Sequence, residues 1–313
     1  MTSCALLFPG QGSQEAGMGR ELAEARPEAM TLWKRAEAIS GLPLREIYWE
    51  GDAAAMSDTR ALQPALTVVN INLWRELAGK VRPCAAAGHS LGEFSALAAA
   101  EVLDPETVLQ IVSLRGRLMA EADPDGTGSM AAILKMKQED VEALAREAAV
   151  DALLIVANYN TPAQFVVSGH RDAVALACQK AKEHRGRAIE LKVSGAFHSP
   201  MMEKASRELE PLLRKAVWRK PQFPVYCNLH GRAVTDGESA KESLLKQMTS
   251  SVLWIETVRN QYADGVRRWV EVGPKAVLGK MVPACLNHLD EAARQELRVE
   301  LVNSLESVEN FSA

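Results

Sequence analysis

Ser90 stands in the sequence Gly88-His89-Ser90-Leu91-Gly92, which matches the pattern Gly-x-Ser-x-Gly. A serine at this spacing can act as a nucleophile when a strand ends just before it and a helix begins just after it, because the sharp turn exposes the hydroxyl group. Flanking glycines let neighbouring backbone pass without a Cβ clash. The alternative role of such a serine is a helix N-cap. The short apolar run before it and the helix formers after it favour the nucleophile.

A serine nucleophile needs a base, and the chain has six histidines. His89 is adjacent to Ser90, so its side chain leaves the backbone in another direction. His198 follows an expected strand, sits among small residues and precedes Ser199-Pro200, a pair that commonly opens a helix. The remaining histidines lie in polar or turn-forming segments: His170, His184, His230 and His288. His198 is therefore the best candidate for the base.

Strands and helices alternate on both sides of these residues. Short apolar runs at 4–8 and 84–89 indicate buried strands, and the segments "PVYCN" and "WVEVG" indicate two more. Helical patterns lie between them, at 27–40, 65–80, 91–103 and 105–122. The alternation predicts an α/β fold with a parallel sheet covered on both faces, and catalytic residues where strand ends meet helix starts.

The order of elements changes near "DPDGTGS" (123–129). From there to about residue 192 the pattern is strand, helix, strand, strand, helix, strand, which is typical of a ferredoxin-like unit. We therefore predict a small ferredoxin-like α+β subdomain at 126–193. It is inserted into a large hydrolase-like α/β domain made of 1–125 and 194–313.

Composition excludes several classes of protein. The 36 basic and 40 acidic residues give a net charge of −4, without the basic excess expected of a nucleic-acid binder. No run of about 18 apolar residues predicts a membrane span, and the first residues do not resemble a signal peptide. The five cysteines form no C-x-x-C pair, so we expect buried reduced thiols, no metal, no redox cofactor and a cytoplasmic location.

Five motifs occur together in one order: "FPGQGSQ" (8–14), "GHSLGEFSAL" (88–97), "RG" (115–116), "GAFHS" (195–199) and "EVGP" (271–274). The set resembles the malonyl-CoA:acyl carrier protein transacylases and the acyltransferase domains of polyketide synthases. The resemblance covers essentially the whole chain, including "QPAL" (63–66) and "NYNTPAQFVVSG" (158–169).

The resemblance implies a role for each matching residue. Ser90 would take a malonyl group from malonyl-CoA and pass it to the phosphopantetheine thiol of an acyl carrier protein by a ping-pong route. His198 would accept and return the proton, with its ring oriented by a carbonyl of Gln247 instead of an aspartate. The backbone N–H groups of Gln11 and Leu91 would form the oxyanion hole.

Two further residues would select the acyl group. Arg115 would hold the free malonyl carboxylate bidentately, whereas Arg117, about 200° further around the same helix, would point away into solvent. In the polyketide relatives, an Ala-Phe-His tripeptide accompanies malonyl selection. Phe197 in this tripeptide would place its ring where an α-methyl group must fit, so malonyl should be preferred to methylmalonyl.

The chain departs from its relatives at Ser251, where they usually carry proline, and at Lys275, where they usually carry glycine. These departures leave open whether the enzyme serves fatty-acid or polyketide synthesis. Two alternative hypotheses for the function are a serine esterase or thioesterase of the α/β-hydrolase class and a non-catalytic module that binds carrier proteins. The hydrolase class expects an acidic residue between the serine and the histidine in the chain.

Docking of an acidic carrier protein to a net acidic enzyme requires a local basic patch. One candidate, the basic patch, is formed by Lys182, Arg185, Arg187 and Lys192. A second is "RKAVWRK" (214–220). The alternative for each is an ordinary solvated charge run.

Overall fold

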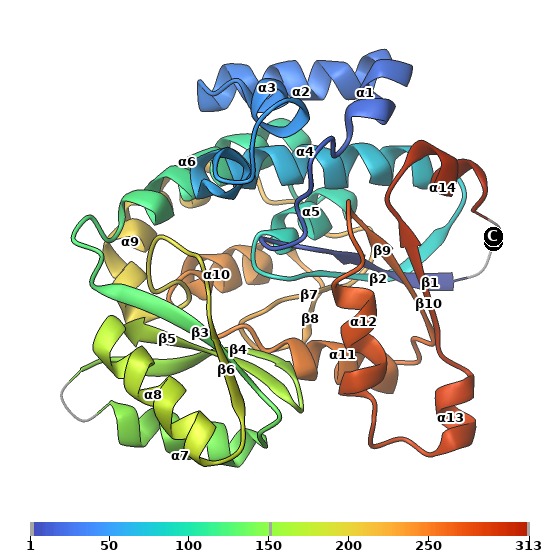
Figure 1. Cartoon of the computed structure of the whole chain (residues 1–313). Coiled ribbons are helices and arrows are strands. Elements are labelled where there is room, and N and C mark those ends of the chain that lie inside the picture. The colour runs from blue at the N-terminus through green and yellow to red at the C-terminus, as the bar shows by residue number, and fades with distance from the viewer. Residues whose placement is uncertain (1–2, 150–151, 312–313) are drawn as a thin grey trace.

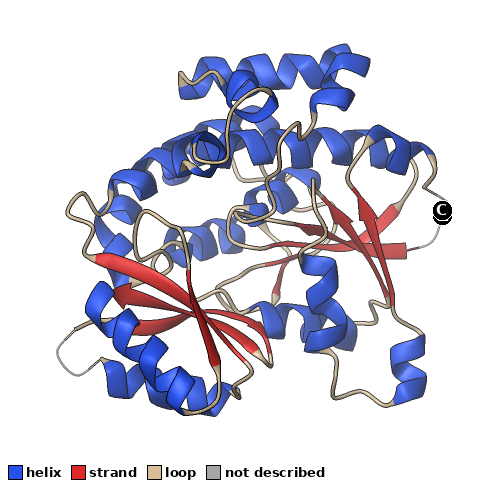
Figure 2. Cartoon of the chain, in the orientation of Figure 1, coloured by secondary structure: helices blue, strands red, loops and turns tan. Residues whose placement is uncertain are grey.

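The computed structural model of the chain describes residues 3–149 and 152–311 and contains two β-sheets (Figure 2). The large sheet has the strand order β10-β9-β1-β2-β7-β8. Its strands are β1 (Ser3–Phe8), β2 (Arg82–Gly88), β7 (Val225–Tyr226), β8 (Ala233–Val234), β9 (Arg268–Val272) and β10 (Arg298–Val302). All neighbours are parallel except β7 and β8. The predicted parallel sheet is therefore a mixed sheet with one short antiparallel edge strand.

Alternation along β1 directs its side chains to two separate clusters. Cys4, Leu6 and Phe8 pack with residues of the helices drawn above the large sheet in Figure 1, whereas Ala5 and Leu7 pack with residues of those below it. A strand that is buried on both faces has no polar alternation, which is why it appears in the sequence as a continuous apolar run. The carboxyl end of this strand leads directly into the loop that carries Gln11.

Helices cover both faces of the large sheet (Figure 1). Those near its upper face are α4 (Thr59–Leu77), α5 (Gly92–Ala99) and α6 (Pro105–Glu121), and those below are α11 (Trp254–Ala263) and α12 (Leu278–Cys285). An outer layer contains α1 (Arg20–Ala25), α2 (Pro27–Ser40) and α3 (Leu44–Trp49). The other helical segments are η1 (Ala55–Ser57), η2 (Pro200–Met202), α9 (Glu203–Lys215), α10 (Gly237–Gln247), α13 (Glu291–Gln295) and α14 (Leu305–Glu309). No helix within the described ranges has the length and apolarity needed to cross a bilayer.

The small sheet has the strand order β4-β5-β3-β6, and all its neighbours are antiparallel. Its elements follow the chain as β3 (Gly128–Leu134), α7 (Gln138–Ala148), β4 (Leu154–Thr161), β5 (Gln164–His170), α8 (Arg171–Glu183) and β6 (Arg187–Glu190). This is the predicted order of elements, although the last strand ends earlier than the run "AIELKV" indicated. One face of the sheet packs against α7 and α8, and the other faces the large sheet (Figure 1).

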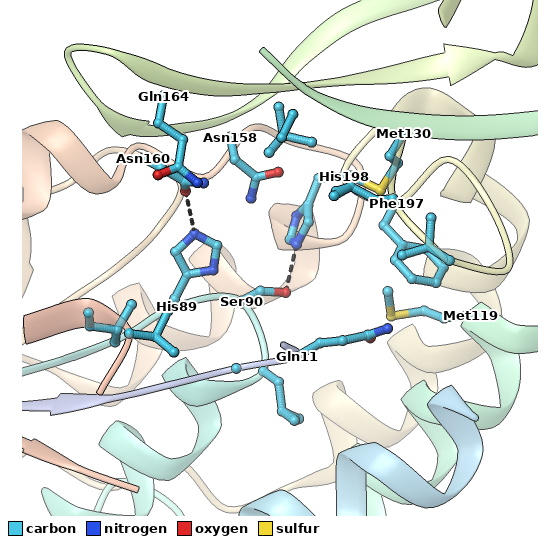
Figure 3. A pocket seen from close by; sticks show the side chains of 18 of the residues that line it. Gln11, His89, Ser90, Met119, Met130, Asn158, Asn160, Gln164, Phe197 and His198 are labelled. Carbon is cyan, nitrogen blue, oxygen red and sulfur yellow. Dashed lines mark hydrogen bonds between the residues drawn. The ribbon is translucent and has the colours of Figure 1, made fainter. Parts of the chain in front are cut away.

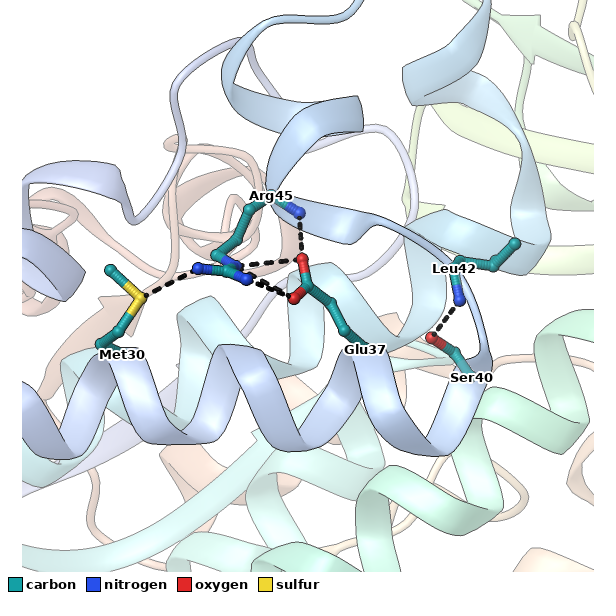
Figure 4. Close-up of polar contacts among 5 residues, drawn as sticks. All are labelled: Met30, Glu37, Ser40, Leu42 and Arg45. Atoms are coloured by element: carbon teal, nitrogen blue, oxygen red, sulfur yellow. Dashed lines mark hydrogen bonds and ion pairs between the residues drawn. The ribbon is translucent and has the colours of Figure 1, made fainter.

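The outer layer is fastened by an ion pair between α2 and α3 (Figure 4). Glu37 accepts hydrogen bonds from the backbone N–H of Arg45 at 2.9 Å and from its guanidinium at 2.7 to 3.0 Å. Burial by itself raises the pKa of Glu37, but the hydrogen bonds from Arg45 outweigh burial and lower that pKa. A carboxylate held in this way gives α3 a fixed direction over α4, the helix that contributes Gln63 to the site.

Two expectations about local structure need correction. Helix α4 begins at Thr59, six residues before the expected start at residue 65, and Pro64 lies inside it. Pro64 falls early in the helix, so it removes only one backbone hydrogen bond near the helix start. Not all cysteines are buried: Cys84 is exposed and Cys178 is partly exposed. Cys84 belongs to the first half of β2, whose side chains extend beyond the covered part of the sheet.

Candidate active site

Ser90 lies on a sharp turn between β2 and α5, as predicted from the sequence. Its φ of 50° is in the left-handed region, which L-residues rarely adopt. A Cβ at Gly88 would lie 1.9 Å from the carbonyl carbon of Gly92, and a Cβ at Gly92 would lie 1.9 Å from the oxygen of Phe8. Both glycines are therefore required by close backbone approach, and the turn projects the Ser90 side chain away from the sheet.

Asn228, which follows β7, holds this turn in place. Its Oδ1 accepts a hydrogen bond of 2.6 Å from the backbone N–H of Ser90, and its Nδ2 donates one of 2.7 Å to the oxygen of Gly88. The side chain is fully buried. A buried amide with both ends hydrogen-bonded makes the unusual backbone conformation of Ser90 a fixed feature of the fold.

His198 approaches Ser90 from the segment that follows the small sheet. Its Nε2 is 2.6 Å from Ser90 Oγ (Figure 3). Its Nδ1 is 3.1 Å from the backbone oxygens of both Gln247 and Ser250. Carbonyl oxygens only accept hydrogen bonds, so Nδ1 carries the proton and Nε2 is the acceptor. The Ser90 hydroxyl therefore donates to His198. No carboxylate among the described residues hydrogen-bonds to the His198 ring, which separates this arrangement from the triad of the α/β-hydrolase class.

The surroundings of His198 keep its ring neutral. Burial is the largest cause that lowers its pKa, the charges of Arg115 and His89 lower it further, and together they bring it to about 3 despite the hydrogen bonds to Gln247 and Ser250. A neutral imidazole with a free Nε2 lone pair can accept the serine proton at neutral pH.

Arg115 lies on α6 beside Ser90 and is 1% exposed. Its Nη1 donates to Gln63 Oε1 at 3.0 Å, and its Nη2 donates to Ser90 Oγ and to Gln247 Oε1, each at 3.1 Å. Burial lowers its pKa to about 10, so the guanidinium stays charged at neutral pH. Arg117, two residues further along α6, is exposed as expected.

Helix α4, which packs against α6, was predicted only in part, because its first six residues were not expected to be helical. A Cβ at Gly116 would lie 2.7 Å from the oxygen of Thr59, so the glycine after Arg115 lets α6 pack closely against the first turn of α4. Because α4 begins early, Gln63 lies on this helix and meets the Arg115 guanidinium. The motif "QPAL" thus contains a side chain of the site, Gln63, whose contact with Arg115 was not predicted.

Two backbone N–H groups at the site have no acceptor within the part of the chain that the structure describes. They belong to Gln11, in the loop after β1, and to Leu91, at the start of α5. The loop of Gln11 lies against the turn of Ser90, because a Cβ at Gly10 would be 2.4 Å from the oxygen of His89. Both residues line the same cavity as Ser90.

The cavity has a volume of about 250 Å³ and lies between the two sheets. Figure 3 shows Asn158, Asn160 and Met130 reaching into it from the small sheet, opposite Ser90 and Gln11.

Asn160 Oδ1 is 2.8 Å from Nε2 of His89, so the side chain of His89 does point away from the nucleophile. Phe197 lines the cavity beside His198. Neither sheet alone would enclose this space.

Ser251, one of the two departures from the relatives, links the small sheet to the turn that orients His198. Its hydroxyl donates to the oxygen of Val156 at 2.7 Å, and the next residue, Val252, exchanges backbone hydrogen bonds of 2.8 and 3.0 Å with Ala157 and Tyr159. Proline could not donate the first of these bonds. Lys275 is exposed. Among the described residues, no three side chains of His, Cys, Asp or Glu gather as metal ligands.

A model of the acyl transferase domain family matches residues 5–308. The malonyl CoA-acyl carrier protein transacylase of Bacillus subtilis is 39% identical over 285 residues, 90% of this chain and 90% of that protein. Its counterpart from Escherichia coli K12 is 35% identical over 302 residues, 95% of this chain and 97% of that protein.

Two solved structures agree with these matches. The malonyl-CoA:acyl carrier protein transacylase of Xanthomonas oryzae has a TM-score of 0.90 at 31% identity and covers 99% of this chain and 98% of its own. A malonyl-transacylase in complex with its type II polyketide synthase acyl-carrier protein has a TM-score of 0.91 at 33% identity, covering 98% of both chains. The chain therefore belongs to the malonyl-CoA:acyl carrier protein transacylases of the acyl transferase domain family.

Proposed function

We propose that this enzyme transfers a malonyl group from malonyl-CoA to the phosphopantetheine thiol of an acyl carrier protein, for fatty-acid or polyketide synthesis. In the first half-reaction Ser90 Oγ attacks the thioester carbonyl while His198 Nε2 takes the hydroxyl proton. The oxyanion that forms lies at the N–H groups of Gln11 and Leu91, which have no other acceptor among the residues that the structure describes. The C–S bond then breaks, and the departing CoA sulfur takes the proton from His198.

The second half-reaction reverses the roles of the same groups. The carrier thiol gives its proton to His198, and its sulfur attacks the malonyl ester on Ser90. The C–O bond breaks, and the proton returns from His198 to Ser90 Oγ. Throughout, the Arg115 guanidinium holds the malonyl carboxylate beside the serine. We propose that these protein groups suffice for the reaction, without a metal or other cofactor.

One observation carries this proposal: Ser90 Oγ lies at hydrogen-bond distance from both His198 Nε2, at 2.6 Å, and Arg115 Nη2, at 3.1 Å. A base and a buried cation on the same nucleophile suit an acyl group that carries its own carboxylate. A neutral acyl group has no carboxylate for the Arg115 cation to bind, and a non-catalytic binding module does not need a base beside the serine.

Labelling with malonyl-CoA tests the proposal directly. We expect a malonyl adduct on Ser90, seen by intact-mass and peptide mass spectrometry, that is stable in buffer and discharged by a holo acyl carrier protein. Ser90→Ala serves as the control and should carry none. Rapid loss of the adduct to water would favour a hydrolase, and no adduct on the parent enzyme would favour a binding module.

The same experiment measures substrate range. We propose that Phe197 restricts the space beside the α-carbon, since its side chain is 5% exposed and lines the cavity next to His198. Methylmalonyl-CoA should therefore load Ser90 more slowly than malonyl-CoA. Equal rates of acylation would contradict this role.

We propose further that the basic patch receives the carrier protein. All four of its cations (Lys182, Arg185, Arg187 and Lys192) are exposed, and none forms an ion pair within the described ranges. Lys192 lies between Leu191 and Val193, which both line the active-site cavity. The second candidate, at 214–220, is less available because Arg214 already pairs with Glu210 and Glu242.

Reversing two charges tests this docking surface. The double variant Arg185→Glu/Arg187→Glu should raise the KM for carrier protein about 10-fold, since rim charges mainly steer association. Acylation of Ser90 by malonyl-CoA should not change. Arg219→Glu/Lys220→Glu on the second candidate is the matched control. Unchanged transfer, or slower acylation, in the first variant would remove the patch from the proposal.

We also propose a division of the chain into two domains. The strand order β4-β5-β3-β6 with two helices on one face supports a ferredoxin-like subdomain at 126–193. The remaining segments, 1–125 and 194–313, would form the hydrolase-like α/β domain. A cytoplasmic location agrees with the free cysteines.

A further inference from the structure

Glu93 is a buried carboxyl group that the proposed reaction does not use. It lies on the first turn of α5, three residues after Ser90, and is 1% exposed. Its Oε2 accepts hydrogen bonds from Gln247 Nε2 at 2.8 Å and from the backbone N–H of Asn228 at 3.2 Å. Burying a carboxyl group is costly unless it is well hydrogen-bonded, so its place beside the active site calls for an explanation.

The side-chain amide of Gln247 connects Glu93 to Arg115. Its Nε2 donates to Glu93 and, at 3.0 Å, to the backbone oxygen of Ser90, while its Oε1 accepts from Arg115 Nη2 at 3.1 Å. An amide turned by 180° would present its NH₂ group to the guanidinium, and two donors cannot hydrogen-bond each other. The acceptors on Glu93 and Ser90 therefore fix which end of the amide faces Arg115.

Glu93 also supports the turn of the nucleophile. The backbone N–H that it binds belongs to Asn228, whose side chain holds both the N–H of Ser90 and the oxygen of Gly88. One carboxyl oxygen thus contacts the two amide residues that hold Arg115 and Ser90 in place.

We propose that Glu93 is a positioning residue for acyl-group selection: as a hydrogen-bond acceptor it orients the Gln247 amide, which aims Arg115 at the malonyl carboxylate. The proposal rests on the proposed function, in which Arg115 binds that carboxylate. Burial, the largest cause, raises the pKa of Glu93 to about 7, although hydrogen bonds from Gln247, Cys227 and Asn228 and the charge of Arg115 lower it. In either protonation state the carboxyl group keeps an oxygen that can accept the hydrogen bond from Gln247.

Two variants of similar size separate the acceptor from the charge. Glu93→Gln keeps an oxygen that can accept from both Gln247 and Asn228, whereas Glu93→Met keeps the volume but accepts nothing. We expect Glu93→Met to lower the ratio of kcat/KM for malonyl-CoA to that for acetyl-CoA about 10-fold, the effect of losing one hydrogen bond in a charged network. Glu93→Gln should keep the parent ratio within about 2-fold.

A variant at Gln247 provides a second test of the same contact if Glu93→Met folds poorly. Gln247→Ala retains the backbone oxygen that binds His198 and should lower the ratio as Glu93→Met does. Adding Glu93→Met to Gln247→Ala should then change the ratio no further, because the amide that Glu93 orients is already absent. An equal loss of malonyl and acetyl transfer in Glu93→Met, with the ratio unchanged, would overturn the proposal. A Glu93→Gln variant as impaired as Glu93→Met would overturn it too, because charge would then be the requirement.

The two proposals fail in different ways. If Arg115→Ala leaves the malonyl to acetyl ratio unchanged, the role of Arg115 is wrong and the role of Glu93 falls with it. If Arg115→Ala changes the ratio and neither Glu93→Met nor Gln247→Ala does, only the role of Glu93 is wrong.

Discussion

His198→Ala should slow the acylation of Ser90 by malonyl-CoA about 10²- to 10⁴-fold, the contribution expected of a positioned base. The reason is that the serine hydroxyl donates a hydrogen bond of 2.6 Å to His198 Nε2. Among the described residues, no other histidine side chain hydrogen-bonds to Ser90, and the neighbouring His89 contacts Asn160 instead. Single-turnover acylation, followed by quenched-flow mass spectrometry, measures the chemical step without product release.

His230→Ala is the matched control for this prediction. His230 contacts Arg232 and Ser243 in a turn away from the nucleophile, so its loss should leave acylation unchanged. Near-normal acylation in His198→Ala together with a loss in His230→Ala would reverse the assignment.

Because the pKa of His198 is about 3, the pH dependence of Ser90 acylation gives a second test of its role. An ordinary histidine gains a proton and stops acting as a base below about pH 6.5. His198 stays neutral there, so acylation by the parent enzyme should hold steady down to about pH 5.

Arg115→Ala should lower kcat/KM for malonyl-CoA about 10²- to 10⁴-fold and leave that for acetyl-CoA much less affected. The malonyl carboxylate must leave water to reach Ser90, and losing one partner of a buried ion pair costs about 3–5 kcal/mol. Acetyl-CoA brings no carboxylate and loses no partner. The ratio of the two values of kcat/KM, in parent and variant, isolates this effect from any general damage to the site.

Two further variants sharpen the assignment. Arg115→Lys keeps the charge but not the two parallel N–H donors, so its ratio should fall between those of the parent and Arg115→Ala. Arg117→Ala, on the exposed face of the same helix, should keep the parent ratio. A ratio that responds to Arg117→Ala and not to Arg115→Ala would mean that the wrong arginine has been assigned to the carboxylate.

The sequence led to the main residues of the site because each stands in a short local pattern. The glycines around Ser90 predicted a turn whose need for glycine the structure confirms. The helical spacing of Arg115 and Arg117 predicted that the two side chains point to different sides of the helix, and the family resemblance assigned Arg115 to the site. His198 was chosen among the six histidines because it follows an expected strand and precedes Ser199-Pro200. The family resemblance added Gln247 as the residue whose carbonyl orients the His198 ring.

The contacts that were missed depend on residues brought together from distant parts of the chain. Asn228 and Glu93 hold the turn of Ser90 through amide and carboxyl groups, which leave no periodic trace in a sequence. Ser250 acts through its backbone oxygen, a group that every residue has, so its identity carries no signal. Strand β8, which was not predicted, has two residues, too few for a pattern of alternation to appear.

The backbone at Ser90 and His198 has a consequence for how such an enzyme evolves. Both residues have left-handed φ angles, 50° and 56°, a conformation that costs an L-residue roughly 1–2 kcal/mol and glycine almost nothing. Glycine would lose about 0.5–1 kcal/mol of this gain through the greater freedom of its unfolded chain. Stability alone would therefore favour glycine at the two positions that the chemistry cannot give up. In a copy of the gene released from selection for transfer, these are the codons where inactivation and a more stable protein would arise together.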